Sequence, residues 1–180
     1  MNRNSTTNGN SRPQPLGQPN VGMNPSGHNT ELVHNLNEIL ANEFVLFTRT
    51  LNYHWNITGP RFQQVHRFLE EHYRKILEMM DQLAERVRVM GARPLSTVHE
   101  MEHQMSLKEK PGRFPDTDGM LRDLVADHSK IMEQLKDTIS REDFFTQDPV
   151  SEDFLIQLLK EHELMAWMIR SHFSETNSQQ

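Results

Sequence analysis

The sequence predicts an all-α protein, built as a four-helix bundle with one long middle connection. Over four long stretches, apolar residues recur at three- and four-residue spacing, the period of an amphipathic helix. No stretch shows the period-two, β-branched pattern of a strand. Helices with one apolar face bury that face most simply against one another, so a bundle follows.

The first two long helices are expected at about 30–57 and 61–91. Thr30 can cap the start of the first helix, and a Thr-Gly-Pro turn at 58–60 ends it. Its apolar stripe is Leu32, Leu36, Leu40, Phe44, Phe47 and Leu51. The stripe of the second helix is Val65, Leu69, Ile76, Met80, Leu83 and Val87. The two helices are therefore joined by a short corner.

The middle connection is expected to contain a short helix. Thr97 and Glu100 have the spacing of a capping box, and prolines at 94, 111 and 115 limit the helix that they open. The third long helix carries the stripe Leu121, Leu124, Val125, His128, Met132, Leu135 and Ile139. The fourth follows Asp148-Pro149, with Ser151 as its expected cap. Its inner residues are Phe154, Leu158, Met165, Ile169 and Phe173.

Composition excludes several classes of protein. The chain has 180 residues, enough for one domain, and no run of 18 to 20 apolar residues that could span a membrane. The N-terminal segment lacks the apolar core of a secretory signal peptide. With no cysteine, the chain forms no disulfide and no Cys-type metal site. Any bound metal must therefore use His, Asp or Glu, and the chain has 10 histidines.

Three segments are expected. Residues 1–30 are rich in Asn, Gly, Pro, Ser and Thr, which predicts a disordered arm. Their only charged side chains are Arg3 and Arg12, the candidate DNA contacts. The arm therefore has a formal charge of +2 and the rest of the chain −8, for a net charge of −6. Residues 31–174 form the bundle, and 175–180 are a polar tail. An acidic body argues against a surface coated by nucleic acid.

Two pairs of potential metal ligands lie on one face of the second helix. His66 and Glu70 are at i, i+4, and so are Asp81 and Glu85. His66 and Asp81 are 15 residues apart, or roughly 22 Å along a straight helix, too far to share an ion within one chain. An antiparallel second copy would place each pair against the other, giving two identical sites per dimer. His54, just before the corner, can join His66 there.

The resulting donor set is two imidazoles and three carboxylates. Such a set suits Fe(II), Mn(II) or Zn(II), with redox iron favoured where coordination positions stay open. From spacing alone, the alternative is an ordinary solvated helix face, which carries polar pairs at the same intervals.

One continuous pattern resembles the signature of the Dps miniferritins, the DNA-protection-during-starvation proteins. It consists of Asn52-Tyr53-His54-Trp55-Asn56-Ile57-Thr58-Gly59, then Phe62, His66, Glu70-Glu71 and Tyr73, then Asp81-Gln82-Leu83-Ala84-Glu85-Arg86 and Gly91. The likeness is weaker but compatible through 148–173 and covers about 140 residues. The family's ligands map onto His54, His66, Glu70, Asp81 and Glu85. Members often have Asp where this chain has Glu70, a difference that could alter one of the two iron positions.

The resemblance implies a ferritin-like bundle assembled into a hollow homo-dodecamer with ferroxidase sites at dimer interfaces. It implies an iron-storing and detoxifying ferroxidase, an oxidoreductase that takes Fe(II) as substrate, with hydrogen peroxide as the preferred oxidant over dioxygen, and so protects DNA. Each site would hold two iron positions, with zinc or manganese as substitutes. A bacterial cytoplasm is the expected location, with association with the nucleoid if the arm binds DNA.

The resemblance also suggests roles for residues around the site. Trp55 and Tyr53 resemble the aromatic residues beside the family's site, with core packing as the alternative. Glu71 is a candidate for mineral nucleation. The candidates for an iron-admitting threefold pore are Asp148, Glu152 and Asp153. Acids are also common at a helix N-terminus for electrostatic reasons, so the pore role has a structural alternative.

Other functions compete with this hypothesis. A DNA-compacting architectural protein with secondary iron chemistry would rely on the arm, whose two arginines predict weak, salt-sensitive DNA binding. His99-Glu100-Met101-Glu102-His103 matches the zinc-protease motif H-E-x-x-H. It lies on a short helix without a third ligand, so a surface helix is the favoured interpretation.

An intrachain di-iron centre is a further alternative. It needs two Glu-x-x-His motifs, and the chain has one, at Glu100–His103. His128 and His162 lie on the inner stripes of the third and fourth helices and are interpreted as hydrogen-bonded core histidines.

Overall fold

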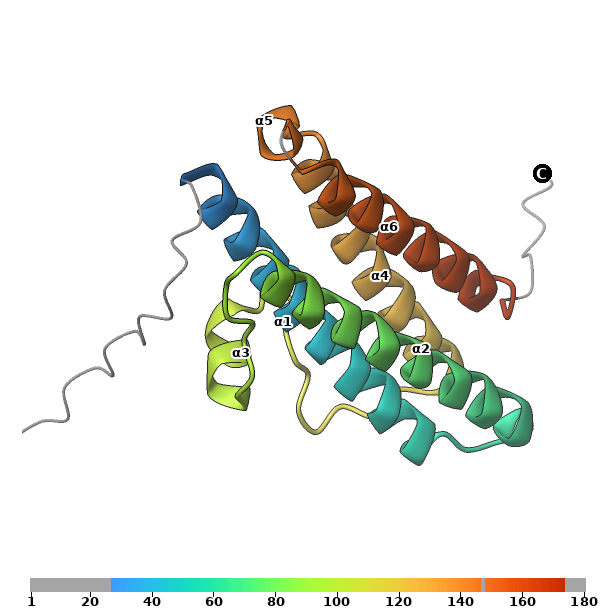
Figure 1. Ribbon diagram of the computed structural model, residues 1–180. Helices are drawn as coiled ribbons and strands as arrows, with labels where there is room; N and C mark the ends of the chain where they lie inside the picture. The colour runs from blue at the N-terminus through green and yellow to red at the C-terminus, as the bar shows by residue number, and fades with distance from the viewer. Residues whose placement is uncertain (1–26, 147, 174–180) are drawn as a thin grey trace, which may run out of the picture.

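Four long helices form an elongated bundle, in which α1 lies along α2 and α4 lies along α6 (Figure 1). The structure is a computed structural model that describes residues 27–146 and 148–173. The helices are α1 (Gly27–Asn56), α2 (Phe62–Val89), α3 (Val98–Gln104), α4 (Thr117–Ile139), α5 (Glu142–Phe145) and α6 (Pro149–Arg170). The described residues contain no strand. The all-α, four-helix prediction is therefore confirmed.

The apolar stripes of the four long helices meet in one core. Fully buried members come from each helix: Leu32, Leu36, Leu40, Val65, Leu69, Ile76, Leu83, Val87, Leu121, Leu124, Leu135, Leu155 and Ile169. Met79, rather than the expected Met80, is the methionine buried on α2. None of the described helices is both long and apolar enough to cross a lipid bilayer.

A tight corner joins α1 to α2. Gly59 has a φ of +99°, a left-handed conformation that strongly favours glycine. Its carbonyl accepts a hydrogen bond from the amide of Phe62, the first residue of α2. The corner reverses the chain and brings the end of α1 against the start of α2, as expected from the Thr-Gly-Pro turn.

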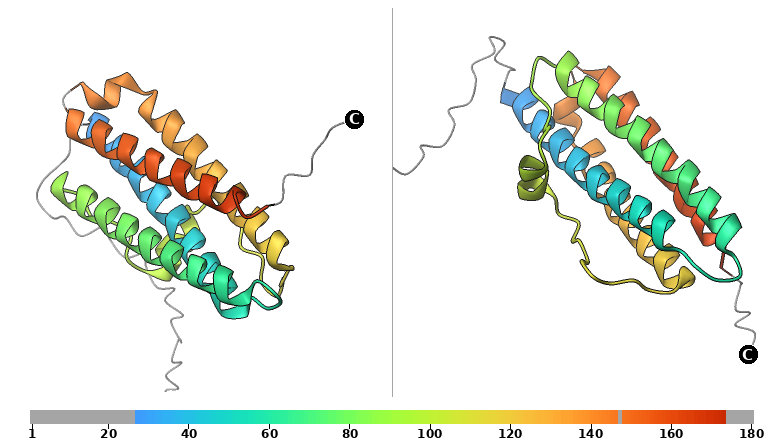
Figure 2. Two further views of the ribbon diagram at one scale, coloured as in Figure 1. Left: turned by 90° about the vertical axis from the view of Figure 1, so that its right-hand side faces the viewer. Right: turned by 90° about the horizontal axis from the view of Figure 1, so that it is seen from below.

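The middle connection runs along the outer side of α1 (Figure 2). Polar side chains of α1 hold it there. The side-chain oxygen of Asn42 accepts hydrogen bonds from the amides of Ser106 and Leu107. Arg49 donates to the carbonyl of Lys108 in the connection and also forms a buried ion pair with Asp127 on α4. Because both anchors start on α1, the connection stays fixed to the helix that carries His54.

The short helix of the connection begins as predicted. The Thr97 side chain accepts from the amide of Glu100, and the Glu100 carboxylate accepts from the amide of Thr97, which together make the capping box. The resulting helix has 7 residues.

Two helix starts differ from the sequence prediction. α1 already begins at Gly27, so Thr30 lies inside the helix and does not cap it. α6 is capped by Asp148, not by Ser151. Pro149 occupies the first turn, where its missing N–H and fixed φ suit a helix start, and the Asp148 side chain accepts from the Ser151 amide. The four-residue helix α5, between α4 and α6, was not expected.

Candidate metal centre

His54 and His66 meet at the corner between α1 and α2. Their rings stack with centroids 3.8 Å apart and an interplanar angle of 18°. His54 is only 8% exposed, whereas His66 is half-buried. The Thr-Gly-Pro turn thus brings together the two histidines that precede and follow it in the sequence.

Reciprocal hydrogen bonds orient the two rings. His54 Nδ1 lies 2.9 Å from the carbonyl oxygen of His66, and His66 Nδ1 lies 2.8 Å from that of His54. A carbonyl only accepts, so each Nδ1 carries the proton and donates it. In the neutral ring this tautomer leaves the lone pair on Nε2, which is then the nitrogen able to bind a metal.

Two aromatic rings pack against this histidine pair, one on each histidine. The Phe62 ring stacks on His66 with centroids 5.0 Å apart. The Tyr73 ring packs edge-on against His54, with centroids 5.3 Å apart. Tyr73 could be found in the sequence as the next member of the ligand-bearing stripe on α2, one turn after Glu70.

Glu70 follows His66 by one turn of α2. Its carboxylate forms an ion pair with Arg74, one turn further along the helix. The Glu70 side chain is 32% exposed and that of Arg74 is 64% exposed. A metal ion at Glu70 would therefore compete with Arg74 for the carboxylate.

Asp81 and Glu85 lie further along α2, and both are exposed. Within residues 27–146 and 148–173, no three His, Asp or Glu side chains are grouped closely enough to hold a metal ion. One chain therefore presents two separate groups of candidate ligands: His54 of α1 with His66 and Glu70 of α2, and the pair of carboxylates further along α2. Leu77 lies between the groups and is 50% exposed, which leaves an apolar surface there.

The two aromatic residues that flank His54 in sequence point to different places. Trp55, the next residue after His54 in the sequence, is 68% exposed. Tyr53 is buried, and its hydroxyl donates to Asp123 Oδ2 at 2.9 Å. Burial, with the Asp123 hydrogen bond, raises the pKa of Tyr53. The ring in contact with His54 is therefore that of Tyr73, not that of Tyr53.

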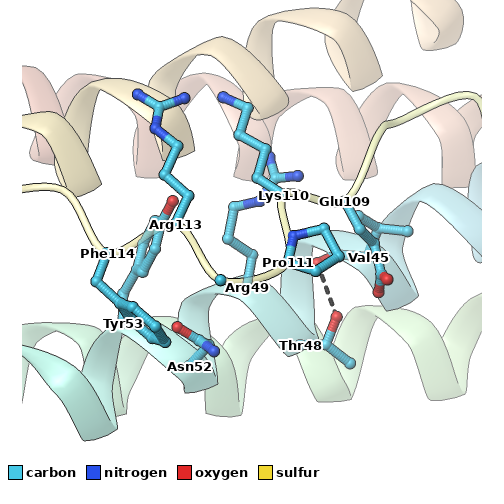
Figure 3. A pocket seen from close by; sticks show the side chains of 11 residues that line it. Val45, Thr48, Arg49, Asn52, Tyr53, Glu109, Lys110, Pro111, Arg113 and Phe114 are labelled. Atoms are coloured by element: carbon cyan, nitrogen blue, oxygen red, sulfur yellow. Dashed lines mark hydrogen bonds between the residues drawn. The ribbon is translucent and has the colours of Figure 1, made fainter.

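Tyr53 lines a cavity of about 210 Å³ between α1 and the connection that precedes α4. Figure 3 shows its side chain pointing from α1 toward that connection, with Arg49, Lys110 and Phe114 around the same space. Burial by itself would raise the pKa of Asp123, but hydrogen bonds from Lys110 and Tyr53 lower it. Tyr53 of α1 and Lys110 of the connection thus donate to the same carboxylate of α4.

The three acidic candidates at the start of α6 have different surroundings. Asp148 caps the helix and pairs with Arg86 on α2 at 2.5 Å. Burial alone would raise its pKa, but hydrogen bonds from Ser151 and Arg86 lower it. Glu152 is half-buried and Asp153 is exposed. Asp148 therefore has a structural role, and Asp153 is the carboxylate that faces solvent.

The remaining candidates are placed as follows. Glu71 is exposed and lines a surface groove near the corner. Arg3 and Arg12 lie outside the described residues.

The Glu100 carboxylate, the expected base of a zinc protease, accepts from the amides of Ser96 and Thr97 and from the Thr97 hydroxyl. These hydrogen bonds, led by that of the Ser96 amide, lower its pKa.

His128 and His162 are fully buried, and their Nδ1 atoms are 2.9 Å apart. Their interpretation as hydrogen-bonded core histidines is confirmed. Their neighbour Glu43 was missed by the sequence analysis. The available signal was its position within the apolar stripe of α1, between Leu40 and Phe47.

The model of the ferritin-like domain matches residues 33–178. A low temperature-induced protein of Nostoc sp. (strain PCC 7120) is 39% identical over 140 residues, 78% of each chain. DNA protection during starvation protein 2 of Bacillus anthracis is 29% identical over 148 residues, covering 82% of this chain and 99% of the relative.

Solved structures give the same result. The Dps protein of Vibrio cholerae O1, described as a member of a broad superfamily of ferritin-like diiron-carboxylate proteins, superposes with a TM-score of 0.74. It is 28% identical, and the superposition covers 80% of this chain and 89% of that one. Bundle, domain match and relatives together define a ferritin-like protein. Within that class, the chain belongs to the Dps miniferritin family.

Proposed function

We propose that the protein oxidises Fe(II) at a site shared by two chains and stores the ferric product inside a dodecameric cage. The supporting observation is that the candidate ligands of one chain fall into two separate groups. His54 of α1 and His66 of α2 direct Nδ1 to backbone carbonyls at the corner, which leaves Nε2 as the nitrogen for a metal, while Asp81 and Glu85 lie exposed further along α2. Two such helices, antiparallel around a twofold axis, complete both sites at once.

The proposed ligands suit iron as a substrate. Imidazole and carboxylate together bind Fe(II) and stabilise Fe(III), and the carboxylates supply the negative charge that the product needs. Hydrogen peroxide is the proposed oxidant. The balanced reaction is 2 Fe²⁺ + H₂O₂ + 2 H₂O → 2 FeO(OH) + 4 H⁺. One electron leaves each ferrous ion, the O–O bond breaks, and no hydroxyl radical is released.

The neighbouring side chains have supporting roles in this proposal. The carbonyls of His54 and His66 hold the rings in the metal-binding tautomer. Phe62 and Tyr73 cover the histidine pair. Trp55, exposed next to His54, is positioned to absorb stray oxidising equivalents. Asp153 is the proposed pore residue and Glu71 the proposed nucleation residue.

Mixing two inactive variants tests the shared site. His66→Ala/Glu70→Ala and Asp81→Ala/Glu85→Ala each remove one half of the ligand set, so each alone should lose iron oxidation. After co-refolding, half of the dimers are mixed, and each mixed dimer has one intact site of two. The mixture should regain about a quarter of the wild-type activity with peroxide. If verified mixed cages regain none, the ligands do not come from two chains, and the proposal is wrong.

A further inference from the structure

The ring of Tyr73, on α2, is held against the face of α1 that carries His54. It packs edge-on against the His54 ring, with centroids 5.3 Å apart and an interplanar angle of 73°. It also packs edge-on against Phe47, with centroids 6.2 Å apart and an angle of 79°. Phe47 and His54 are seven residues apart, or about two helical turns, so both lie on one face of α1. These two contacts fix Tyr73 beside a candidate iron ligand.

Tyr73 differs chemically from the other ring that contacts the histidine pair. That other ring is Phe62, which stacks on His66. A phenyl ring has no proton that can leave with an electron, whereas a phenol loses an electron readily when its hydroxyl proton leaves too. The Tyr73 side chain is half-buried, and its hydroxyl donates to none of the residues that the structure describes. Of the two rings, Tyr73 is therefore the one that can be oxidised.

The other oxidisable aromatic side chains have different surroundings. The chain has two tyrosines and two tryptophans. Tyr53 is buried and its hydroxyl donates to Asp123. Trp55 and Trp167 are both exposed, and within residues 27–146 and 148–173 neither packs against another aromatic ring. Tyr73 is thus the one among these four, in the part of the chain that the structure describes, whose ring contacts a candidate ligand.

The proposed reaction has a step at which an extra electron is needed. Reduction of hydrogen peroxide to water takes two electrons, which two ferrous ions supply together. A site that holds a single ferrous ion supplies one, and breaking the O–O bond with one electron releases a hydroxyl radical. A phenol in contact with an iron ligand can give the missing electron at that moment.

We infer that Tyr73 supplies this second electron when only one ferrous ion is bound. The inference rests on the proposed function, because it requires iron to be oxidised by peroxide at the histidine pair. The balanced step is Fe²⁺ + Tyr–OH + H₂O₂ + H⁺ → Fe³⁺ + Tyr–O• + 2 H₂O. Iron and tyrosine each lose one electron, the O–O bond breaks, and the phenolic proton ends on a water molecule. The next ferrous ion restores the side chain: Tyr–O• + Fe²⁺ + H⁺ → Tyr–OH + Fe³⁺.

The radical itself gives the test. The assembled protein is loaded anaerobically with one ferrous ion per site, mixed with one equivalent of hydrogen peroxide and frozen for electron paramagnetic resonance. We expect a tyrosyl signal from the wild type. Tyr73→Phe keeps the ring and removes the hydroxyl, so it should lose the signal and release more hydroxyl radical to a spin trap. Tyr53→Phe, the matched change at the other tyrosine, should keep the signal.

The iron loading distinguishes electron donation from mere packing. With two ferrous ions per site, both electrons come from iron, so the wild-type tyrosyl signal should be weaker than with one. A signal that is unchanged in the Tyr73→Phe variant would overturn the inference. So would a signal that is lost in the Tyr53→Phe variant alone, or its replacement by a tryptophan radical that Trp55→Phe removes.

Two results separate this inference from the proposed function. Wild-type protein that oxidises iron with peroxide at full loading, yet gives no tyrosyl signal at one ferrous ion per site, refutes the role of Tyr73 and leaves the shared site untouched. No iron oxidation at either loading refutes both. Should the Tyr73→Phe variant not assemble, a nitroso spin trap on the wild-type chain decides. An adduct that mass spectrometry locates on Tyr73 supports the inference, and an adduct only elsewhere contradicts it.

Discussion

Histidine behaves differently in two parts of this molecule because its partners differ. At the corner, Nδ1 of His54 and His66 faces a backbone carbonyl. In the core, His162 lies between a carboxylate and a second imidazole. At the corner the carbonyl acceptors favour the tautomer of the neutral ring with its proton on Nδ1, whereas in the core the carboxylate holds the His162 ring in place. The chemistry of each histidine therefore follows from its hydrogen-bond partner rather than from its residue type.

Removing the competing cation at Glu70 should strengthen metal binding. Arg74 pairs with Glu70 in the structure, and an exposed pair of this kind is weak. Arg74→Gln should therefore tighten Fe(II) binding by about two- to fivefold, through loss of the pair and of a nearby positive charge. Anaerobic calorimetric titration measures this. Arg88→Gln, which removes an exposed charge elsewhere on α2, is the control, and unchanged affinity in the Arg74 variant would contradict the prediction.

Acid should destabilise the metal-free protein through His128. Burial lowers the pKa of this residue from its usual 6.5, so the unfolded chain binds a proton that the folded chain excludes. Its contribution to stability is complete above about pH 6.5 and falls as the pH drops from there toward the folded-state pKa. The slope from one such group is at most about 1.4 kcal/mol per pH unit.

Thermal unfolding between pH 7.5 and 5.5 measures this slope. His128→Gln should reduce the pH dependence, without abolishing it because burial also lowers the pKa of His72 and His172. His34→Gln, an exposed position on α1, should leave the dependence as in the wild type. Equal slopes in all three proteins would show that His128 is not the proton acceptor.

At the scale of elements, α2 has two different faces: one packs into the core, and the other carries most of the candidate ligands. The inner face buries Leu69, Ile76 and Leu83 in the core. The outer face carries His66, Glu70, Asp81 and Glu85, which do not enter the core. A straight helix keeps the outer groups in a fixed register, so a second chain can match them.

The start of α6 carries two acids with different surroundings, because Asp148 is paired and Asp153 is exposed. Asp148→Ala removes the helix cap and the partner of Arg86, and should lower the free energy of unfolding by about 1–3 kcal/mol. The pKa of Asp148 is lowered. Its contribution is therefore present above its usual value near 4 and is lost as the pH falls through the lower folded-state value.

Asp153→Ala is the matched variant on the same helix. Asp153 is exposed, so its replacement should leave thermal unfolding unchanged and slow the uptake of Fe(II) if it lines the pore. Thermal melts should show lower stability for the Asp148→Ala variant alone, and stopped-flow oxidation should show slower uptake for the Asp153→Ala variant alone. Slow uptake in the Asp148 variant alone, with normal stability, would reverse the assignment.

At the scale of the whole molecule, the arm and the cage should be independent. Deleting residues 1–26 keeps all of α1, which begins at Gly27. The truncated protein should still form an assembly of about twelve chains, as measured by light scattering. It should also oxidise iron at the wild-type rate. Any retardation of DNA in gels should be lost, because Arg3 and Arg12 are removed. Tight DNA binding by the truncated cage would place the DNA surface elsewhere.

The bundle could be predicted from the sequence, and so could the position of His66, Glu70, Asp81 and Glu85 outside the buried core. Helix period and helix position depend on neighbours a few residues apart, and such neighbours are visible along the chain. The capping box at Thr97 and the reversal at Gly59 are local in the same way. The cap of α6 was misplaced because Asp148 and Ser151 are both good cap residues, and only backbone geometry chooses between them.

The partners of side chains that are distant in sequence were decided by tertiary structure. Tyr53 turns to Asp123, 70 residues away, and Tyr73 takes the place beside His54. Glu43 meets His162 across 119 residues. Helix periodicity states which face a residue occupies, but not which residue of another helix lies opposite. That choice depends on how four helices pack together, which no local pattern encodes.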